Sequence, residues 1–266
     1  MSIKVLVLTG EGLNCESETA FAFQLAGAQT QIMHVRDLFD NPSCLRDFQI
    51  LAIIGGFSYG DHLGAGNVLA NMMQRYVGDE IERFIAGDRL VIGICNGFQV
   101  LARTGILPGI SKPWKAQFSL ISNDLGVFEN RWVHLRVHPK SKCLWTRELE
   151  SLYLPVRHGE GKFFTPDIAL IKNMEDSGKI VLQYTSPGSG EPAMEYPHNP
   201  NGSMASIAAV CNDRGTVLGM MPHPEAYLFQ WQHPLYTRRK VSKALHCLEP
   251  CGTVLFKSAV RALECD

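Results

Sequence analysis

The sequence lacks an excess of charge of either sign, and it lacks long apolar runs. Its 26 acidic residues nearly balance its 25 basic residues, which leaves a net charge of -1. We therefore expect no basic surface that recruits nucleic acid or an anionic membrane. The apolar runs are no longer than strands, which excludes a membrane-spanning helix. The first residues lead straight into a strand-like run without the apolar region of a signal peptide, so we expect a cytoplasmic protein.

The sequence also lacks the cysteine and histidine spacing of a metal site. None of its eight cysteines forms a C-x-x-C pair, and even Cys247 and Cys251 stand apart with Glu249 and Pro250 between them. The nine histidines are scattered as well. Structural zinc sites need two ligand pairs near each other, so the sequence predicts no metal site. A long chain with scattered cysteines is more typical of a reduced cytosolic protein than of a disulfide scaffold.

Strand-like and helical segments alternate through the first hundred residues. Four short apolar runs predict strands, at 4–10, 31–35, 50–55 and 89–95. Asn14 is expected to cap a helix that ends before Gly27. A longer helix is predicted at about 68–86, and residues 96–103 are also predicted to be helical. This alternation favours an α/β fold with a mostly parallel sheet flanked by helices. In such sheets, ligands bind beyond the carboxyl ends of the strands.

The pattern changes after residue 118 to β-rich segments with polar connections and little helical periodicity. We interpret 118–182 as an antiparallel β excursion attached to the parallel sheet. Two further strands are predicted at 205–211 and 216–221, and helical pieces follow from about 226 to 266. The sequence has no internal repeat and no low-complexity tract. We therefore expect residues 1–266 to form a single domain.

The first candidate for chemistry is Cys95, in the segment Gly93-Ile94-Cys95-Asn96-Gly97. This segment lies where a buried strand is predicted to end and a helix to begin. A nucleophile on such a turn stands clear of the sheet, and the helix N-terminus favours a thiolate and supplies amide donors for an oxyanion. A buried core cysteine is the alternative interpretation, but the strand-to-helix context favours the nucleophile.

A cysteine nucleophile needs a base, and the base needs an orienting group. His223 directly follows the strand predicted at 216–221, at the sheet edge where Cys95 should emerge. Pro222 and Pro224 restrict the backbone on both sides of the histidine. Glu225 lies two residues further on and could accept the imidazole N–H. The alternative interpretation is a surface histidine beside a solvated glutamate.

Two glycine-containing segments also follow predicted strands. The segment from Gly55 to Asp61 offers backbone amides that can approach a ligand closely, although it lacks the spacing and the lysine of a phosphate loop. The segment from Arg157 to Gly161 is polar and compact. It is either part of a site or an ordinary hairpin turn, and the residues alone do not decide between the two.

Together these segments resemble the class I glutamine amidotransferases, and more narrowly the PurQ family, which comprises the glutaminase subunits of phosphoribosylformylglycinamidine synthase. The matching segments are collinear: Gly55-Gly-Phe-Ser-Tyr-Gly-Asp61, Gly93-Ile-Cys-Asn-Gly-Phe-Gln99, Arg157-His-Gly-Glu-Gly161, Asn199-Pro-Asn-Gly-Ser203 and Gly219-Met-Met-Pro-His-Pro-Glu225. The resemblance implies that Cys95 is the nucleophile, that His223 is its base and later acid, and that Glu225 orients the histidine.

The resemblance also implies roles around this triad. The amide of Asn96 is expected to meet the oxyanion, together with a second amide from either Gly56 or Phe57. Gln99, one helical turn after the nucleophile, is expected where related enzymes hold glutamine. His158 is expected at the substrate as well.

The implied reaction is hydrolysis of L-glutamine through a cysteine thioester, with ammonia passed to a PurL-type synthetase subunit in purine biosynthesis. The synthetase would use ATP and Mg²⁺, and this chain would need no cofactor. In some members a small PurS-type subunit bridges the two proteins. Residues 226–266 are longer than the ending of the smallest family members, which leaves the bridging subunit open. The alternatives are an amidotransferase with another acceptor, a free-standing γ-glutamyl hydrolase, and a scaffold with a silent triad.

Overall fold

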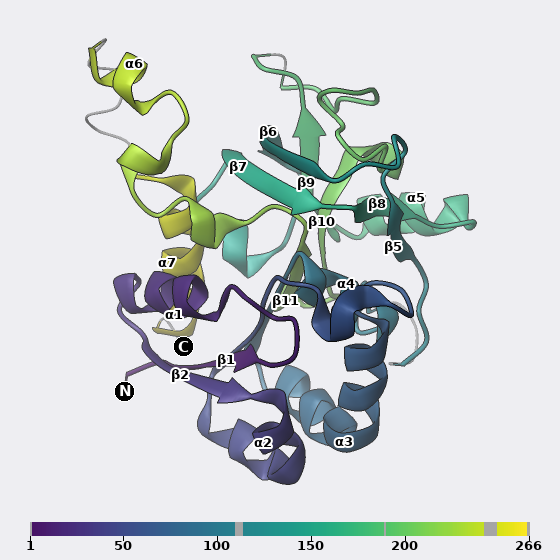
Figure 1. The fold of residues 1–266 in the computed structure, drawn as a ribbon, viewed down its shortest axis with the longest axis vertical. Helices are drawn as coiled ribbons and strands as arrows, with labels where there is room; N and C mark the ends of the chain where they lie inside the picture. The colour runs from purple at the N-terminus through teal and green to yellow at the C-terminus, as the bar shows by residue number, and fades with distance from the viewer. Residues whose placement is uncertain (1, 110–113, 189, 242–248, 265–266) are drawn as a thin grey trace.

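The computed structural model describes residues 2–109, 114–188, 190–241 and 249–264. Figure 1 shows a large sheet with helices on both sides. The strands are β1 (Lys4–Thr9), β2 (Gln29–His34), β3 (Ile50–Ile53), β4 (Leu90–Ile94), β5 (Ser119–Ser122), β6 (Glu129–Val137), β7 (Ser151–His158), β8 (Glu160–Phe164), β9 (Ile180–Thr185), β10 (Ile207–Cys211) and β11 (Val217–Met220). The α-helices are α1 (Glu16–Leu25), α2 (Val35–Asp40), α3 (Asn67–Ala86), α4 (Asn96–Arg103), α5 (Ile168–Asp176), α6 (Tyr236–Val241) and α7 (Cys251–Glu264).

The main sheet has nine strands in the order β2-β1-β3-β4-β11-β10-β9-β6-β7. The pairs from β2 to β11 are parallel, and those from β11 to β7 are antiparallel. Strands β5 and β8 form a separate antiparallel pair. The predicted α/β fold and its antiparallel excursion are therefore confirmed.

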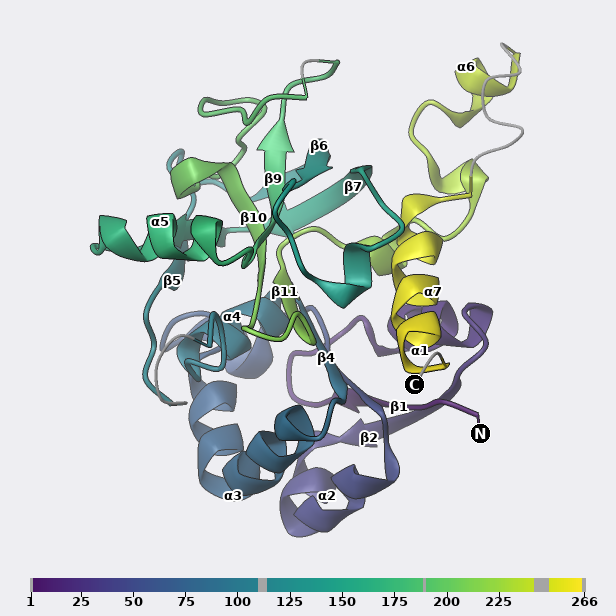
Figure 2. The same cartoon turned by 180° about the vertical axis from the view of Figure 1, so that it is seen from behind.

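Helices cover the parallel half of the sheet on both faces. Helix α1 packs against α7 on one side, and α3 packs against α4 on the other, as the two opposite views show (Figures 1 and 2). Every residue of β3 and β4 is buried, which explains their uniformly apolar sequences. When crossovers are right-handed, connections that run in opposite directions across the sheet, as β1 to β2 and β3 to β4 do, place their helices on opposite faces.

The C-terminal helix belongs to the main core. The ring of Phe23 in α1 lies 4.8 Å from that of Phe256 in α7 and 6.3 Å from that of Trp145, each in an edge-to-face arrangement. All three side chains are buried. This aromatic cluster joins α7 to the first helix of the chain and also to the connection between β6 and β7.

Several local predictions need correction. The N-cap position of helix α1 is Cys15 rather than Asn14, and no side chain donates or accepts a capping hydrogen bond there. Helix α2 was not predicted; it follows β2 without a loop and is capped by the His34 ring, which accepts a hydrogen bond from the Arg36 amide. Helix α5 lies inside the segment predicted to have little helical character, and Asp167 caps it. Helix α2 has six residues, too few for helical periodicity to stand out, and α5 buries only Leu170 and Met174 among its nine residues.

Six cysteines fall within the described residues, and all six are free thiols. Cys247 and Cys265 lie outside the described residues. None of the described helices is long and apolar enough to cross a membrane.

Candidate active site

Cys95 occupies a strained turn between β4 and α4. Its backbone angles are φ 51° and ψ -103°, a conformation that residues other than glycine seldom adopt. A side chain at Gly97 would overlap the carbonyl oxygen of Ile53 in β3, and one at Gly93 would approach Leu101 to 2.5 Å. The two glycines therefore let α4 begin directly against the sheet, and this closeness holds Cys95 in the turn.

His223 and Glu225 follow β11, the strand that pairs with β4. The register aligns Met220 with Ile94, so the segments after both strands leave the sheet at the same edge. His223 Nδ1 lies 2.5 Å from Glu225 Oε1, and both side chains are almost fully buried. The carboxylate thus holds the imidazole in one orientation with Nδ1 towards Glu225.

The surroundings of His223 favour a charged ring. Burial alone favours the neutral form and is the largest single influence, but the Glu225 carboxylate and the Cys95 thiolate favour the cation. Together these groups raise the pKa of His223 well above its usual value. The ring is therefore well suited to hold a proton taken from a thiol.

Cys95 and His223 meet over Gly55, the first residue of the glycine loop that follows β3. A Cβ at Gly55 would lie 2.9 Å from His223 Cε1 and 3.6 Å from Cys95 Cβ. His223 Nε2 has no hydrogen-bond partner among the described residues, so it is available to the nearby Cys95 thiol. Gly55 therefore leaves the space in which the two side chains approach each other.

The glycine loop also decides which of its amides is available to a ligand. The loop lies against Gly12 and Leu13, and a side chain at Gly56, whose φ is 142°, would overlap the Gly12 carbonyl oxygen. The Phe57 amide donates a hydrogen bond of 2.8 Å to that same oxygen. Among the described residues, the Gly56 amide has no backbone acceptor. Phe57 is thus engaged, and Gly56 is the amide left for an oxyanion.

A pocket of about 210 Å³ opens beside the Cys95 thiol. Ten residues line it: Gly56, Phe57, Asp61, Cys95, Gln99, Phe128, Arg157, His158, Gly159 and Glu160. The predicted residues from the glycine loop, the cysteine turn and the 157–161 segment therefore surround one cavity. Its small volume suits a molecule the size of an amino acid.

Gln99 forms part of the pocket wall, and its amide is held by neighbouring groups. Gln99 Oε1 accepts a hydrogen bond of 2.8 Å from Asn96 Nδ2, and Gln99 Nε2 donates one of 2.5 Å to the Glu160 carbonyl. Asn96 Nδ2 also donates to Asp61, at 3.2 Å. This network joins the cysteine turn, the glycine loop and the 157–161 segment.

His158 lies in the pocket wall as a neutral ring. Burial and the neighbouring His223 lower the pKa of His158 to about 3. The His158 Nδ1 atom lies 3.1 Å from Asn123 Oδ1.

The 157–161 segment is not an ordinary hairpin turn. Strand β7, before Gly159, pairs with β6, whereas β8, after Gly159, pairs with β5.

Cys15, which the sequence motifs did not single out, lies beside the His223–Glu225 pair. One donor atom from each of Cys15, His223 and Glu225 lies within 4.8 Å of the other two. Among the described residues, this is the one group of three or more such side chains close enough to hold a metal ion. Its position just after β1, at the sheet edge shared with Cys95, is the signal that could have identified it.

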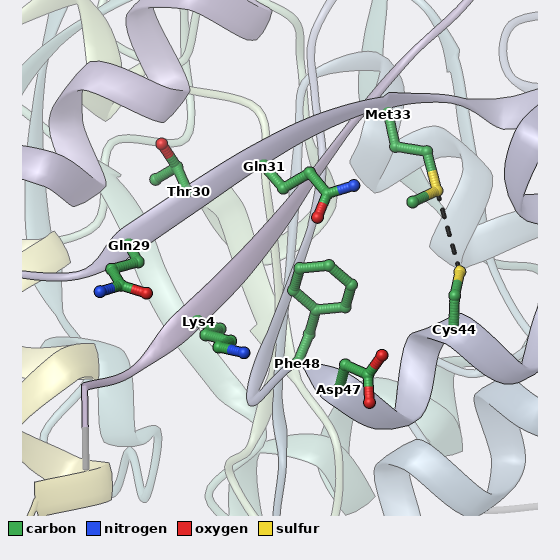
Figure 3. Close-up of a pocket in the computed structure, with 8 residues that line it drawn as sticks. All are labelled: Lys4, Gln29, Thr30, Gln31, Met33, Cys44, Asp47 and Phe48. Atoms are coloured by element: carbon green, nitrogen blue, oxygen red, sulfur yellow. Dashed lines mark hydrogen bonds between the residues drawn. The ribbon is translucent and has the colours of Figure 1, made fainter.

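A second cavity, of about 370 Å³, lies at the outer edge of the sheet beside β2 (Figure 3). Figure 3 shows Met33 of β2 facing Cys44, and the two sulfur atoms are 3.9 Å apart. The residues that line this cavity are Lys4, Gln29, Thr30, Gln31, Met33, Cys44, Asp47 and Phe48. None of them belongs to the segments that surround Cys95.

The fold and this site define a class of protein. An open α/β sheet carries a cysteine on a strand-to-helix turn against a buried histidine–glutamate pair, as the resemblance to class I glutamine amidotransferases implied. The CobB/CobQ-like glutamine amidotransferase domain family matches residues 2–261. The chain belongs to this family.

Proteins similar to this chain include PurQ subunits. Phosphoribosylformylglycinamidine synthase subunit PurQ of Dehalococcoides mccartyi is 42% identical over 260 residues, which are 97% of each protein. The same subunit of Treponema denticola is 42% identical over 243 residues, 85% of this chain and 88% of the relative. A chain in the structure of PurLQS from Thermotoga maritima matches with a TM-score of 0.71 at 26% identity, covering 99% of this chain and 100% of that one. The resemblance to the PurQ family is confirmed.

Proposed function

We propose that this chain is the glutaminase subunit of a phosphoribosylformylglycinamidine synthase, which hydrolyses L-glutamine and delivers ammonia to a synthetase subunit. The observation that carries the proposal is that Cys95 and the buried His223–Glu225 pair lie close together around Gly55, beside the small pocket. The identity to PurQ subunits along nearly the whole chain supports the same acceptor.

The proposed first step transfers the Cys95 proton to His223. Glu225, which is fixed on Nδ1, stabilises the imidazolium that forms. The N-terminus of α4 stabilises the thiolate, because the helix dipole places partial positive charge there.

The thiolate then attacks the side-chain amide carbon of glutamine, and the carbonyl electron pair moves onto oxygen. We propose that the amides of Asn96 and Gly56 donate to this oxyanion, and that Phe57 does not, because its amide already donates to Gly12. Gln99 and His158 are proposed to form the wall that contacts the rest of the substrate.

The tetrahedral intermediate collapses when the carbon–nitrogen bond breaks. The imidazolium of His223 gives its proton to the leaving nitrogen, which departs as ammonia, and a γ-glutamyl thioester remains on Cys95. His223 next takes a proton from water, whose oxygen attacks the thioester and breaks the carbon–sulfur bond. Return of that proton to sulfur regenerates the thiol, so the products are glutamate and ammonia.

The partner of the proposed reaction is a PurL-type synthetase subunit. The Thermotoga maritima structure is a PurLQS assembly, which supports docking of this chain to PurL-type and PurS-type subunits. On this proposal the synthetase uses ATP and Mg²⁺ to convert formylglycinamide ribonucleotide to its amidine, and this chain needs no cofactor. We also propose a cytoplasmic location, which the free state of the six described cysteines supports.

The test compares nitrogen sources for amidine formation. The PurL-type partner, ATP and formylglycinamide ribonucleotide are mixed with the native chain, with Cys95→Ala, or with Cys44→Ala as a thiol control at the far sheet edge. We expect Cys95→Ala to abolish the glutamine-driven reaction and to leave the reaction with ammonium salt intact. Cys44→Ala should support both reactions.

Other outcomes point to other functions. If the native chain adds nothing to the rate when glutamine is the nitrogen source, the acceptor is wrong and other synthetases should be tested. If the isolated chain hydrolyses glutamine rapidly and the partner does not change that rate, a free-standing γ-glutamyl hydrolase is the better assignment.

A further inference from the structure

Cys15 is a thiol beside the proposed catalytic pair, yet the proposed reaction does not use it. We propose that Cys15, His223 and Glu225 form a binding site for a zinc-like divalent cation, and that the bound cation blocks glutamine hydrolysis. The binding site stands on the geometry alone, whereas the inhibition rests on the proposed function.

The three side chains come from segments far apart in the sequence that the sheet brings together. Cys15 follows β1, and the other two follow β11. One sulfur, one nitrogen and one oxygen donor lie within 4.8 Å of one another. A Cβ at Gly55 would lie 3.4 Å from Cys15 Sγ and 2.9 Å from His223 Cε1, so no side chain separates the thiol from the ring.

Two buried polar atoms in this group lack a hydrogen-bond partner. Within the described part of the chain, neither His223 Nε2 nor Glu225 Oε2 has one. Both side chains are more than nine-tenths buried. Buried groups of this kind are normally satisfied by protein, water or an ion, so these two atoms are available to a ligand.

The donor set favours zinc over harder cations. Calcium and magnesium prefer oxygen ligands alone, whereas zinc binds cysteine, histidine and carboxylate donors together. Zinc ligand distances of about 2.0–2.3 Å place neighbouring donors roughly 3.3–3.8 Å apart. The donors here need only small shifts to reach that spacing, and Cys15 is partly exposed, so its side chain can adjust. Three protein ligands leave a fourth position for water.

Binding a cation here is incompatible with the proposed catalysis. Cys15 loses its proton to solvent, and its sulfur donates an electron pair to the ion. A ring nitrogen of His223 likewise gives up any proton it holds and donates an electron pair to the ion. The ring can then no longer take the proton of Cys95. The cation therefore occupies the base, while the Cys95 nucleophile stays in place.

The first experiment measures binding without using activity. Co²⁺ is titrated into the full chain carrying Cys95→Ala, so that the nucleophile cannot supply a thiolate. We expect one Co²⁺ per chain and a thiolate-to-cobalt charge-transfer band. Adding Cys15→Ala should remove the band and raise the Kd for Co²⁺ at least about tenfold. Loss of a residue that hydrogen-bonds to a metal ligand already lowers metal affinity by about this factor, and loss of the ligand itself should lower it no less. Cys44 is another partly buried thiol, and adding Cys44→Ala should leave both the band and the Kd unchanged.

The second experiment needs no variant. Iodoacetamide labels the native protein with and without Zn²⁺, and each cysteine is followed by peptide mass spectrometry. We expect Zn²⁺ to slow labelling of Cys15 at least about tenfold and to leave Cys44 unaffected. A Co²⁺ complex without the charge-transfer band, a band that survives Cys15→Ala, or equal labelling of Cys15 with and without Zn²⁺ would overturn the site. Binding without inhibition would overturn only the link to glutamine hydrolysis.

Discussion

Cys95 combines a costly backbone conformation with contacts that hold it in place. A positive φ at a residue of this type costs about 1–3 kcal/mol, and it persists only where surrounding structure enforces it. The Cys95 amide donates a hydrogen bond of 2.8 Å to the Met220 carbonyl, which ties the turn to β11. The same strand leads to His223. A single backbone contact therefore helps to position both the thiol and its proposed base.

Replacing Glu225 by glutamine tests how the base is oriented. The substitution keeps the shape of the side chain but removes the charge that favours the imidazolium, so the pKa of His223 should fall. We expect kcat/KM for glutamine to drop at least about 100-fold while the circular dichroism spectrum stays unchanged. Glu175→Gln is the matched control, since Glu175 lies 3.9 Å from His138 in another histidine–glutamate pair, in which the glutamate side chain is exposed. Native kinetics in Glu225→Gln would remove Glu225 from the triad.

The cysteines should differ strongly in their reactivity towards iodoacetamide. Burial raises the pKa of Cys251 to about 11 and also raises the pKa of Cys143, so few of their thiols are ionised near neutral pH. Cys95 opens onto the pocket and lies near His223, the residue that we propose accepts its proton. We expect Cys95 to be labelled faster than either, as measured by peptide mass spectrometry in the absence of added metal. If Cys95 falls among the slow thiols, it is a core cysteine.

At the scale of elements, the parallel strands assemble the site. Strands β1, β3, β4 and β11 are neighbours in the sheet, and their carboxyl ends lie at one edge. The segments that follow these strands supply Cys15, the glycine loop, Cys95 and His223. Each residue is thus placed by the end of its own strand, which is why residues 15 to 225 can meet in one site.

The close approach of α4 to β3 should be sensitive to one methyl group. In Gly97→Ala the new side chain would overlap the Ile53 carbonyl oxygen, and the backbone on both sides would have to move. We expect the free energy of unfolding to fall by about 3 kcal/mol or more in urea denaturation. Gly87→Ala is the control, because its φ is -90° and its nearest contact would be an ordinary 3.4 Å; it should change stability by no more than about 1 kcal/mol. Equal stability of the two variants would show that α4 is not held tightly.

At the scale of the whole molecule, the two halves of the chain share one sheet. The antiparallel strands β10, β9, β6 and β7 extend the parallel half without a break. Helix α7 then returns to pack on α1. Because core contacts join both ends of the described chain, we propose that it forms a single domain, as the sequence predicted.

The isolated chain should be a poor glutaminase. Phe57 and Phe128 line the pocket with rings 6.3 Å apart, yet about half of each side chain is exposed, so the pocket is open where a partner is proposed to dock. We expect addition of the PurL-type partner to raise kcat/KM for glutamine hydrolysis at least about tenfold, which corresponds to roughly 1.4 kcal/mol. The measurement is glutamate release with and without the partner. Equal rates would mean that the chain alone already holds the competent site.

Local patterns in the sequence determined the α/β class, helix 96–103 and the three residues proposed as the triad. These features depend on neighbours in the chain, such as the glycines around Cys95 and the prolines around His223. Helix α2 escaped because its six residues leave too little periodicity, and α5 escaped because it lies among β-rich segments and buries only Leu170 and Met174.

Only the tertiary structure decided which distant groups meet. It assigned the Phe57 amide to Gly12 and left that of Gly56 free, although the two residues are neighbours in one glycine loop. It also brought Cys15 next to His223 and Glu225, a group that metal-ligand spacing along the chain could not reveal. The physical reason is the same in each case: the contacts are set by the order and register of parallel strands, which join residues far apart in the chain.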